Sequence, residues 1–416
     1  MPRFSKRGIW CGSLEAGKSQ AEVDAYVARR HNAGFNLLLV HLKGGDGLVY
    51  WPSDRFPEAI APGYEAFDLP QALLLACRER GMELHAWFID YYEGENGPAH
   101  RAHPEWAALD AHGRSTAEET LRGRRYSSIW MCPARRPGYT DQWLVPLYKE
   151  FAERYDFDAI HHDYIRYPGD LAPDQYCFCD HCLEHIPQWA GYLTKAFPEE
   201  PFFHELYDRP YLEAHWEQSP RVLPANWAKL DRTSKSRFLL NGSFFQAGRN
   251  DLDYFFYAYR VHFVREFARL AREAVGRARP GMKLSAAVFK NPIHSGRFLG
   301  QDWRTFAGYV DQLLPMDYRD HYPGSFETYL ALLKESIHQQ KEWARDFESL
   351  WPGFAINFLF KEEEIATGGT GPWPAEKLHR TIEAIAETGV DGLAMFCEGH
   401  LHQYGLWDAA REALTG

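Results

Sequence analysis

The stretch FDAIHHDYIRYP, residues 157–168, decides the fold that this sequence predicts. Its first half reads as a short buried strand, which must end near Asp163 because polar residues and a proline follow. Asp163 is therefore expected at the carboxyl end of a strand. In parallel α/β folds the loops that leave the strands converge at this end, so ligands bind there. The stretch predicts both a strand and a site.

Outward from this stretch, the chain alternates strands and helices. A glycine that ends a helix stands before an apolar strand at Gly34, Gly81, Gly281 and Gly389. Strands are predicted at 7–11, 35–40, 82–89, 157–163, 282–289, 310–317, 354–358 and 390–396, and helices at 20–31, 68–80, 254–277 and 375–388. Eight such units predict a closed (β/α)8 barrel. We expect one α/β domain over 1–416, with the Pro-, Cys- and aromatic-rich segment 169–250 inserted after the fourth strand.

Composition excludes several functions. The 416 residues are 45% hydrophobic and 25% charged, as in an ordinary globular protein, and the net charge of -11 argues against a nucleic-acid partner. No apolar run has the roughly 18 to 20 residues that a membrane span needs. No signal-peptide pattern precedes the first strand, and the seven scattered cysteines suit a reducing compartment, so we expect a cytoplasmic protein. The oligomeric state stays open.

Three related segments place carboxylates at strand ends. FDAIHHD, VDQLLPMD and VDGLAMFCE each carry an aspartate near their start and finish on Asp163, Asp317 and Glu398. All three would leave even-numbered strands of the barrel, so their side chains are predicted to converge over one opening. Asp90 follows strand 82–89 in the same way. Each of these carboxylates could instead cap a helix or pair with a loop cation.

Several motifs resemble the glycosyl-hydrolase-like family 10 proteins. They are HAWFIDYY at 85–92, HPEW at 103–106, IWMCPARRPGYTDQ at 129–142 and YDFDAIHHDYIRYP at 155–168, and LLPMDY at 313–318 is similar to a motif of related barrels. The resemblance implies a (β/α)8 barrel that acts on glycosidic bonds, or that descends from such enzymes. His161 and His162 stand where Leu or Phe is common in that family.

Glycoside hydrolysis needs one protonated and one ionised carboxyl group. We predict that Asp163 is the ionised one, held so by Arg166 or a protonated histidine, and that Asp317, or else Glu398, is the acid. Asp90 is predicted to bind a sugar hydroxyl or to act as an alternate partner. The other predicted substrate-binding residues are Trp87, His41, His162, Arg166 and Tyr318, with Trp10 and His85 either in the pocket or in the core. We expect a carbohydrate substrate and no catalytic cofactor; a barrel that binds carbohydrate without cleaving it is the alternative.

A second motif suggests a different enzyme class. GSLEAGKS, Gly12 to Ser19, fits the phosphate-binding pattern GxxxxGK[ST] between a strand and a helix, which would make the protein a P-loop nucleotide hydrolase. Against this, Glu15 would place a carboxylate in a phosphate loop, and Ser19 with Glu22 forms an ordinary capping box. We therefore expect a barrel loop and a helix cap.

The insertion contains a cluster of cysteines. In CFCDHC, Cys177, Cys179 and Cys182 lie within six residues and surround His181. This density is typical of a structural zinc site, which would stabilise a region too poor in apolar residues to hold itself. Cys132 or a histidine of the insertion could supply the fourth ligand.

Overall fold

The fold is a closed (β/α)8 barrel, as predicted. The computed structural model describes residues 3–118, 120–121, 124–126, 128–169, 176–186, 226–241, 251–360 and 373–416. Eight positions of parallel strands close in the order β1-β2-β3-β8-β9-β10-β12-β13, because β13 pairs with β1 and β10 pairs with β9. Their bounds are β1 Lys6–Cys11, β2 Leu37–Lys43, β3 Glu83–Ile89, β8 Ala159–Asp163, β9 Lys283–Phe289, β10 Gln312–Met316, β12 Gly353–Ala355 (extended by β11, Ser349–Leu350) and β13 Gly392–Phe396.

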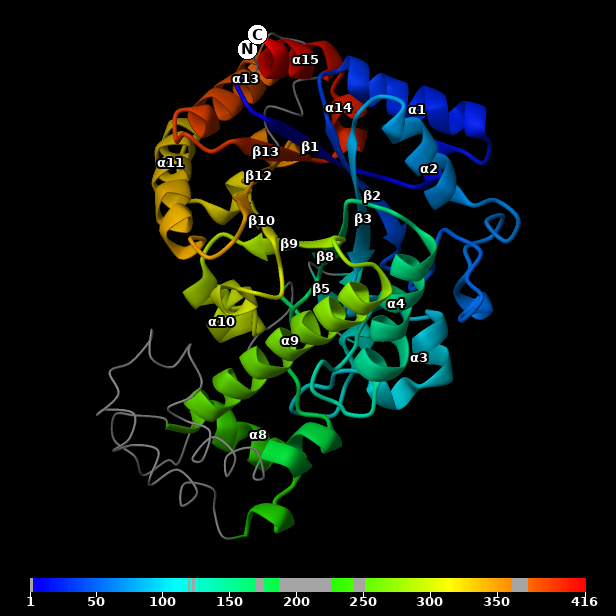
Figure 1. Ribbon diagram of the computed structural model, residues 1–416. Coiled ribbons are helices and arrows are strands. Elements are labelled where there is room, and N and C mark those ends of the chain that lie inside the picture. Colours follow the sequence, from blue (N-terminus) through cyan, green and yellow to red (C-terminus); the bar gives the residue numbers. More distant parts are fainter. Residues whose placement is uncertain are drawn as a thin grey trace.

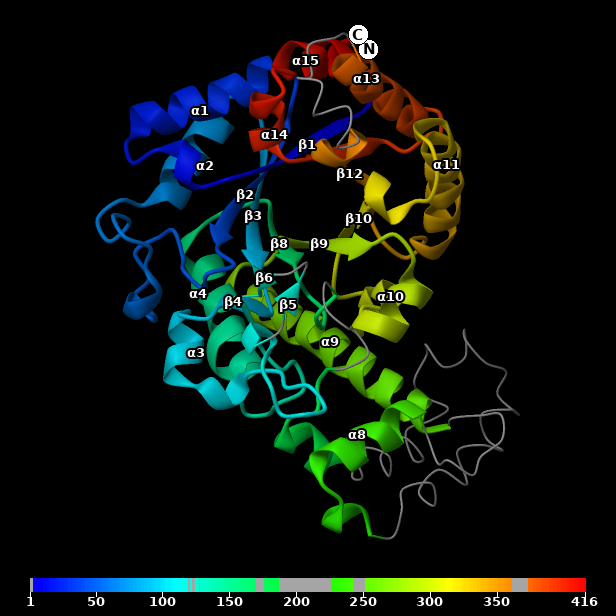
Figure 2. The same cartoon turned by 180° about the vertical axis from the view of Figure 1, so that it is seen from behind.

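Helices surround the strands in an outer layer (Figure 1). The helices of the described residues are α1 Gln20–Asn32, α2 Leu69–Arg78, α3 Pro98–Ala102, α4 Val145–Arg154, α8 Arg232–Asn241, α9 Asp251–Ala278, α10 Pro292–Leu299, α11 Phe326–Trp343, α13 Trp373–Ala386, α14 Glu398–Gln403 and α15 Trp407–Thr415. Of these, α8 lies on the side of α9 that faces away from the strands. Figure 2 shows the same barrel from behind, and in both views the chain's two ends lie together beside α13 and α15. No helix in the described ranges is long and apolar enough to cross a membrane.

The helix boundaries follow from local sequence. The Ser19 hydroxyl accepts a hydrogen bond from the Glu22 N–H, and the Glu22 carboxylate accepts one from the Lys18 N–H, so α1 begins with the predicted capping box. At its other end Gly34 has a φ of 88°, a left-handed conformation that favours glycine. Asp68 caps α2 in the same way, by accepting from the Gln71 N–H.

Two strand predictions need correction. Strand β2 runs on to Lys43 through an irregular register at His41, beyond the predicted end at residue 40. The predicted strand 354–358 is only half right, because β12 ends at Ala355 and Asn357–Leu359 is a 3-10 helix. Ile356 has already turned to φ -63° and ψ -44°, since the chain must leave the barrel at this end.

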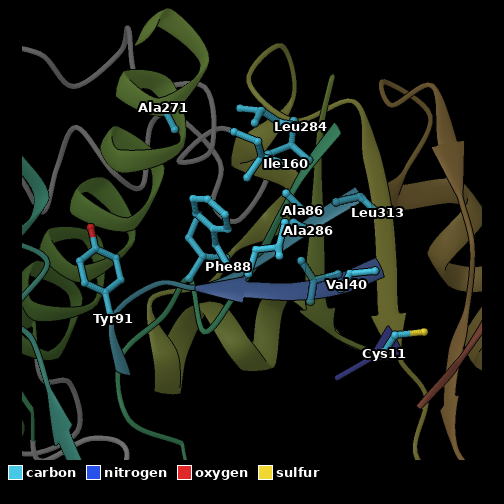
Figure 3. Packing of buried hydrophobic residues seen from close by; sticks show 14 of the residues in the cluster. Cys11, Val40, Ala86, Phe88, Tyr91, Ile160, Ala271, Leu284, Ala286 and Leu313 are labelled. Carbon is cyan, nitrogen blue, oxygen red and sulfur yellow. The ribbon is translucent and has the colours of Figure 1, made fainter. Parts of the chain in front are cut away.

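Strand register decides which side chains face the lumen. Trp87 pairs with His161, and Ile89 pairs with Asp163, so these positions share one face of the sheet. The alternate residues face the helices and form the main hydrophobic core, and Figure 3 shows part of it: Val40, Ala86, Ile160, Leu284 and Leu313. A one-residue offset along a strand therefore moves a side chain from the lumen to the helical layer.

The lumen is filled. Trp10, Leu37, Leu39, Ala287, Leu314, Met316, Trp351 and Ala394 form its apolar core. Beside them, the Trp10 indole N–H donates to His161 Nε2 over 3.1 Å, and His161 Nδ1 lies 2.8 Å from Ser285 Oγ. His85 Nδ1 lies 3.0 Å from the same hydroxyl, and its Nε2 lies 2.8 Å from Glu83 Oε1. Trp10 and His85 are thus core residues rather than pocket lining.

The hydrogen bonds between these lumen side chains all run in one direction, from Trp10 to Glu83. The indole of Trp10 can only donate, so Nε2 of neutral His161 accepts and its Nδ1–H donates to Ser285. The Ser285 hydroxyl then donates to His85, which donates to Glu83. Burial lowers the pKa of His161, which keeps that ring neutral. The lumen therefore holds a fully paired polar chain.

Most of the predicted insertion, 169–250, falls outside the described residues. The described parts are 176–186, which ends in a helix, and 226–241, which includes α8. A short ribbon also follows strand β3: β4 (Tyr92–Gly94) pairs antiparallel with β7 (Ser128–Trp130).

Candidate active site at the carboxyl end of the barrel

A cavity of about 480 Å³ opens at the carboxyl end of the barrel strands. Strand ends and the loops after them line it: His41, Gly45, Trp87, Ile89, Tyr92, Asp163, Tyr164, Arg166, Phe289, Met316, Tyr318, Asp320, His321, Phe358 and Phe396. Five of the nine predicted catalytic and substrate-binding residues are among them: Asp163, Trp87, His41, Arg166 and Tyr318. This is the edge where parallel α/β barrels carry their ligand sites.

Asp163 is the buried carboxylate of this pocket. It is the last residue of β8, and only 7% of it is exposed. Its Oδ2 accepts a hydrogen bond from the Trp87 indole N–H over 3.1 Å, and its Oδ1 accepts from the Tyr164 N–H over 2.7 Å. Arg166 Nη1 lies 3.4 Å from Oδ1. The protein thus orients both carboxylate oxygens.

The surroundings raise the pKa of Asp163 above its ordinary value. Burial is the main cause, and it outweighs the opposing effects of Arg166 and of the two N–H donors. The sequence predicts that Arg166 or a protonated histidine holds Asp163 in its ionised form, and Arg166 does lower this pKa. The net shift is upward because a largely buried carboxylate loses more hydration than one cation at 3.4 Å restores.

The backbone after Asp163 is strained. Tyr164 has a φ of 54°, a left-handed conformation that a bulky residue rarely adopts. This conformation brings the Tyr164 N–H onto Oδ1 of Asp163. It also sets the Tyr164 ring below the Arg166 guanidinium, 4.2 Å from the ring centroid. Strain of this kind persists where the structure around a site holds it in place.

Aromatic rings form the walls of the pocket. His41 lies 4.6 Å from Trp87 between ring centroids, and Tyr318 stacks on Phe396 at 5.7 Å and on His321 at 5.6 Å. Such faces can stack on the apolar face of a sugar ring. Burial lowers the pKa of His41 to about 4, so its ring is neutral near pH 7. Its Nε2 is buried and has no hydrogen-bond partner within the described residues.

Asp317 lies behind the sheet rather than in the pocket. It is fully buried, and its Oδ1 accepts hydrogen bonds from Gln340 at 3.0 Å, from Ser336 at 3.2 Å and from the Tyr322 hydroxyl. Burial raises the pKa of Asp317 to about 7. The predicted neutral environment is therefore present, but the side chain faces α11 and does not meet Asp163 in the cavity.

Asp90 and His162 also face the helical layer. His162 Nδ1 lies 2.9 Å from Asp90 Oδ2, and the Tyr148 hydroxyl on α4 donates to Asp90 Oδ1 over 2.7 Å. Asp90, His162 and Tyr148 are all fully buried. Neither predicted substrate-binding residue lines the cavity, because each stands at the alternate position of its strand.

Glu398 is held by α1. It is the first residue of α14, it forms a buried ion pair with Arg30, and it accepts hydrogen bonds from the Gly12 N–H at 2.8 Å and the Tyr26 hydroxyl at 3.1 Å. These partners satisfy both oxygens outside the pocket. The structure therefore does not bring Glu398 to Asp163.

Asp320 is a pocket carboxylate that the sequence reasoning missed. It belongs to the 3-10 helix Arg319–His321, its side chain is 42% exposed, and its Oδ1 lies 4.0 Å from His321 Nε2. Its position in the loop that leaves strand β10 is the signal that could have found it, because such loops line the site of a parallel barrel. Met316 and Tyr318, earlier in the same segment, line the cavity as well.

The Gly12–Ser19 loop has the structure of a helix cap. Lys18 Nζ donates to the Pro62 carbonyl over 2.9 Å and lies 4.8 Å from the Tyr64 ring centroid, and the Gly12 N–H is engaged by Glu398. Two groups that a phosphate would need are thus committed to protein partners.

The fold and the pocket define a barrel of the glycoside hydrolase type. The chain belongs to the family described as "Putative glycosyl hydrolase domain", which matches residues 8–396. The match does not distinguish the family 10 proteins that the motifs resemble. No protein of curated function matches the sequence.

Solved structures share the fold. The PgaB (BpsB) glycoside hydrolase domain from Bordetella bronchiseptica superposes with a TM-score of 0.65 at 12% identity, covering 99% of each chain. The catalytic domain of β-amylase from Paenibacillus polymyxa gives 0.59 at 13% identity, again over 99% of each chain. The β-galactosidase from Bacillus circulans sp. alkalophilus gives 0.55 at 13% identity over 95% of this chain and 51% of the other. At such identities the likeness shows the fold alone.

Proposed function

We propose that this protein is a glycoside hydrolase and that Asp163 is its general acid. The observation that supports this proposal most strongly is the position of Asp163. It is a buried carboxyl group with a raised pKa at the end of β8, in an aromatic-walled cavity. A raised pKa favours the protonated form of the carboxyl group, which is the form that a general acid needs for transfer to the leaving glycosidic oxygen. The family match and the shared barrel fold support this reading. The finer likeness to family 10 remains part of the proposal.

The proton would reside on Oδ2. Among the described residues, Oδ1 has two donors, the Tyr164 N–H and Arg166, whereas Oδ2 has only the Trp87 indole. Oδ2 is therefore the oxygen with a free lone pair for the proton. Arg166 would then stabilise the carboxylate that forms after proton transfer.

Asp320 is the proposed second carboxylate. Glycosidases need a partner that attacks the sugar or activates water. The half-exposed Asp320 lies in the same cavity and has room for a water molecule beside it. The rings of His41, Trp87 and Tyr318, which line the cavity, would bind the sugar ring. No cofactor is required for this chemistry.

The alternative is a barrel that binds carbohydrate without cleaving it. The aromatic walls favour binding in either case, so only turnover separates the two functions. Purified wild type and Asp163→Asn would be incubated with a panel of polysaccharides and aryl glycosides, with detection of new reducing ends. Calorimetric titration of the same ligands would measure binding to both proteins.

Cleavage by the wild type that is lost in Asp163→Asn, with binding kept, supports the hydrolase. Binding by both proteins without cleavage of any ligand supports the binding protein. Equal turnover by both proteins contradicts the role of Asp163.

A further inference from the structure

Four cysteines that are distant in sequence meet behind the pocket. Cys132 follows β7, and Cys177, Cys179 and Cys182 come from the described part of the insertion. Their sulfur atoms all lie within 4.8 Å of one another, and all four residues are buried. The sequence had left the fourth member open between Cys132 and a histidine. His181 Nε2 instead lies 3.1 Å from the Ala134 carbonyl and accepts from the Arg136 N–H, so Cys132 completes the set.

The sulfur spacing fits a tetrahedral metal ion. Zinc bound to four thiolates at about 2.3 Å places neighbouring sulfurs about 3.8 Å apart. Cys132 Sγ lies 3.5 Å from Cys182 Sγ and 3.8 Å from Cys179 Sγ. All four are free cysteines. A set of four sulfurs with this geometry selects zinc, or iron in a rubredoxin-like site, over oxygen-preferring metals.

The surroundings supply donors for thiolate sulfurs. The buried Tyr167 hydroxyl has no hydrogen-bond partner among the described residues, and Tyr167 lies close enough to Cys132, Cys177 and Cys182 to interact electrostatically with them. The buried Tyr259 on α9 also interacts electrostatically with Cys182 and Cys132. Hydroxyl donors of this kind offset the negative charge of a metal-bound thiolate cluster.

The cluster joins the insertion to the wall of the pocket. Two residues before Cys132, Trp130 lies 5.5 Å from Tyr164 between ring centroids and 5.8 Å from the Arg166 guanidinium. Tyr167 directly follows Arg166 in sequence. On the other side, the Phe178 N–H donates to the Leu109 carbonyl and its ring stacks on Phe256 of α9 at 4.8 Å.

We propose that Cys132, Cys177, Cys179 and Cys182 bind one structural zinc ion, which fixes the loop after β8 and the strand β7 to the insertion. The ion would lie behind Arg166 and outside the cavity, so it would hold the pocket wall without touching the substrate. This proposal is independent of the proposed hydrolase activity.

Metal analysis is the first test. Wild type purified under reducing conditions should contain about one zinc per chain, and Cys177→Ser and Cys182→Ser should lose at least half of it. Cys77→Ser is the matched control, because Cys77 is a buried cysteine on α2 outside the cluster. Equal zinc contents in Cys177→Ser and Cys77→Ser, iron in place of zinc, or no metal in the wild type would overturn the proposal.

A second test needs only the wild type, in case the variants fail to fold. Replacement of the bound metal by cobalt should give the intense visible bands and thiolate charge-transfer absorption of a tetrahedral site. Weak bands of an octahedral ion, or a Cys132–Cys182 disulfide found by mass spectrometry in the reduced protein, would exclude the site.

Hydrogen exchange tests the structural role. Removal of zinc by a chelator should increase amide exchange at 128–132 and 176–186 while strand β2 stays protected. Unchanged protection at both segments after complete zinc removal would show that the ion does not hold this wall.

Discussion

Strands β8 and β10 are equally long, but the carboxylates at their carboxyl ends stand at different offsets. Asp158 and Asp311 precede these strands in equivalent ways, since the carboxylate of Asp158 accepts from the Leu84 N–H and that of Asp311 accepts from the Leu284 N–H. Asp163 lies five residues after its starting aspartate, but Asp317 lies six residues after its own. Because strand side chains alternate, the extra residue turns Asp317 to the helical layer.

The two carboxyl groups therefore have different surroundings although both follow apolar strands. Asp163 faces the cavity with Trp87 and Arg166, whereas Asp317 is enclosed by Gln340, Ser336 and Tyr322. Burial raises the pKa of both. A raised pKa alone thus does not identify a catalytic acid; the face of the strand does.

The largest expected effect comes from exchanging each aspartate for its amide. Asp163→Asn should lower kcat/KM by about 10³-fold, because the amide keeps the shape and loses the transferable proton. Asp317→Asn should stay within about tenfold of the wild type, since it only supports the wall from behind. Steady-state kinetics on a substrate identified by the glycan panel measures both.

Circular dichroism and thermal melting control for folding of the two variants. A larger loss of turnover in folded Asp317→Asn than in folded Asp163→Asn would reverse the assignment of the two strand ends.

The next effect is on stability. The folded pKa of Asp317, about 7, lies above the ordinary value of 3.8, so the folded state binds the proton more tightly than the unfolded chain. Its contribution to stability is complete below pH 4 and is lost as pH rises towards 7. Relative to Asp317→Asn, the wild type should lose roughly 3 kcal/mol between pH 5 and pH 8. Urea denaturation of both proteins at each pH measures the difference; parallel pH profiles would contradict it.

A smaller effect is expected on the pH dependence of kcat/KM when Arg166 is replaced. The protonated form of Asp163 is proposed to be active, so kcat/KM should fall as pH rises through its pKa. Arg166→Gln removes a cation that lowers this pKa, and the alkaline limb of the profile should move up by about one pH unit. Arg304→Gln is the control, since Arg304 pairs with Asp302 outside the cavity lining. An upward shift of the acid limb, with an unchanged alkaline limb, would argue that Asp163 acts in its ionised form.

The smallest effect is expected at the loop after β1. Lys18→Ala should change the free energy of unfolding by less than about 0.5 kcal/mol, because this exposed lysine makes one hydrogen bond and one ring contact. Activity should not change. Micromolar binding of ATP to the wild type, lost in this variant, would restore the nucleotide hypothesis.

The sequence predicted the barrel well because its signals are local. Glycines such as Gly34 and Gly81 mark helix ends, and Ser19 marks a helix start, independently of the tertiary fold. Asp163 was placed correctly at a strand end for the same reason. The face of the sheet on which Asp317 lies could have been predicted by counting alternate positions from Asp311. This signal was present in the sequence but was not used.

Other parts of the site depend on contacts that the sequence does not display. Glu398 lies seven residues after Asp391, an odd offset like the five residues from Asp158 to Asp163, yet β13 ends at Phe396 and Arg30 of α1 binds the side chain. The burial that raises the pKa of Asp163 comes from elements distant in the chain. Cys132 joined the cysteine cluster only through the folded path of strand β7.

The filled lumen determines how a ligand can enter and leave the pocket. Below the cavity, Trp10, Leu39 and Leu314 together with the paired chain from His161 to Glu83 close the barrel axis. The depression at the opposite end, lined by residues such as Lys6 and Glu83, therefore has no passage to it through the barrel. Among the described residues, the pocket is therefore closed at its base. A ligand that occupies it enters and leaves at the carboxyl end of the barrel, past aromatic side chains such as Tyr318 and Phe396.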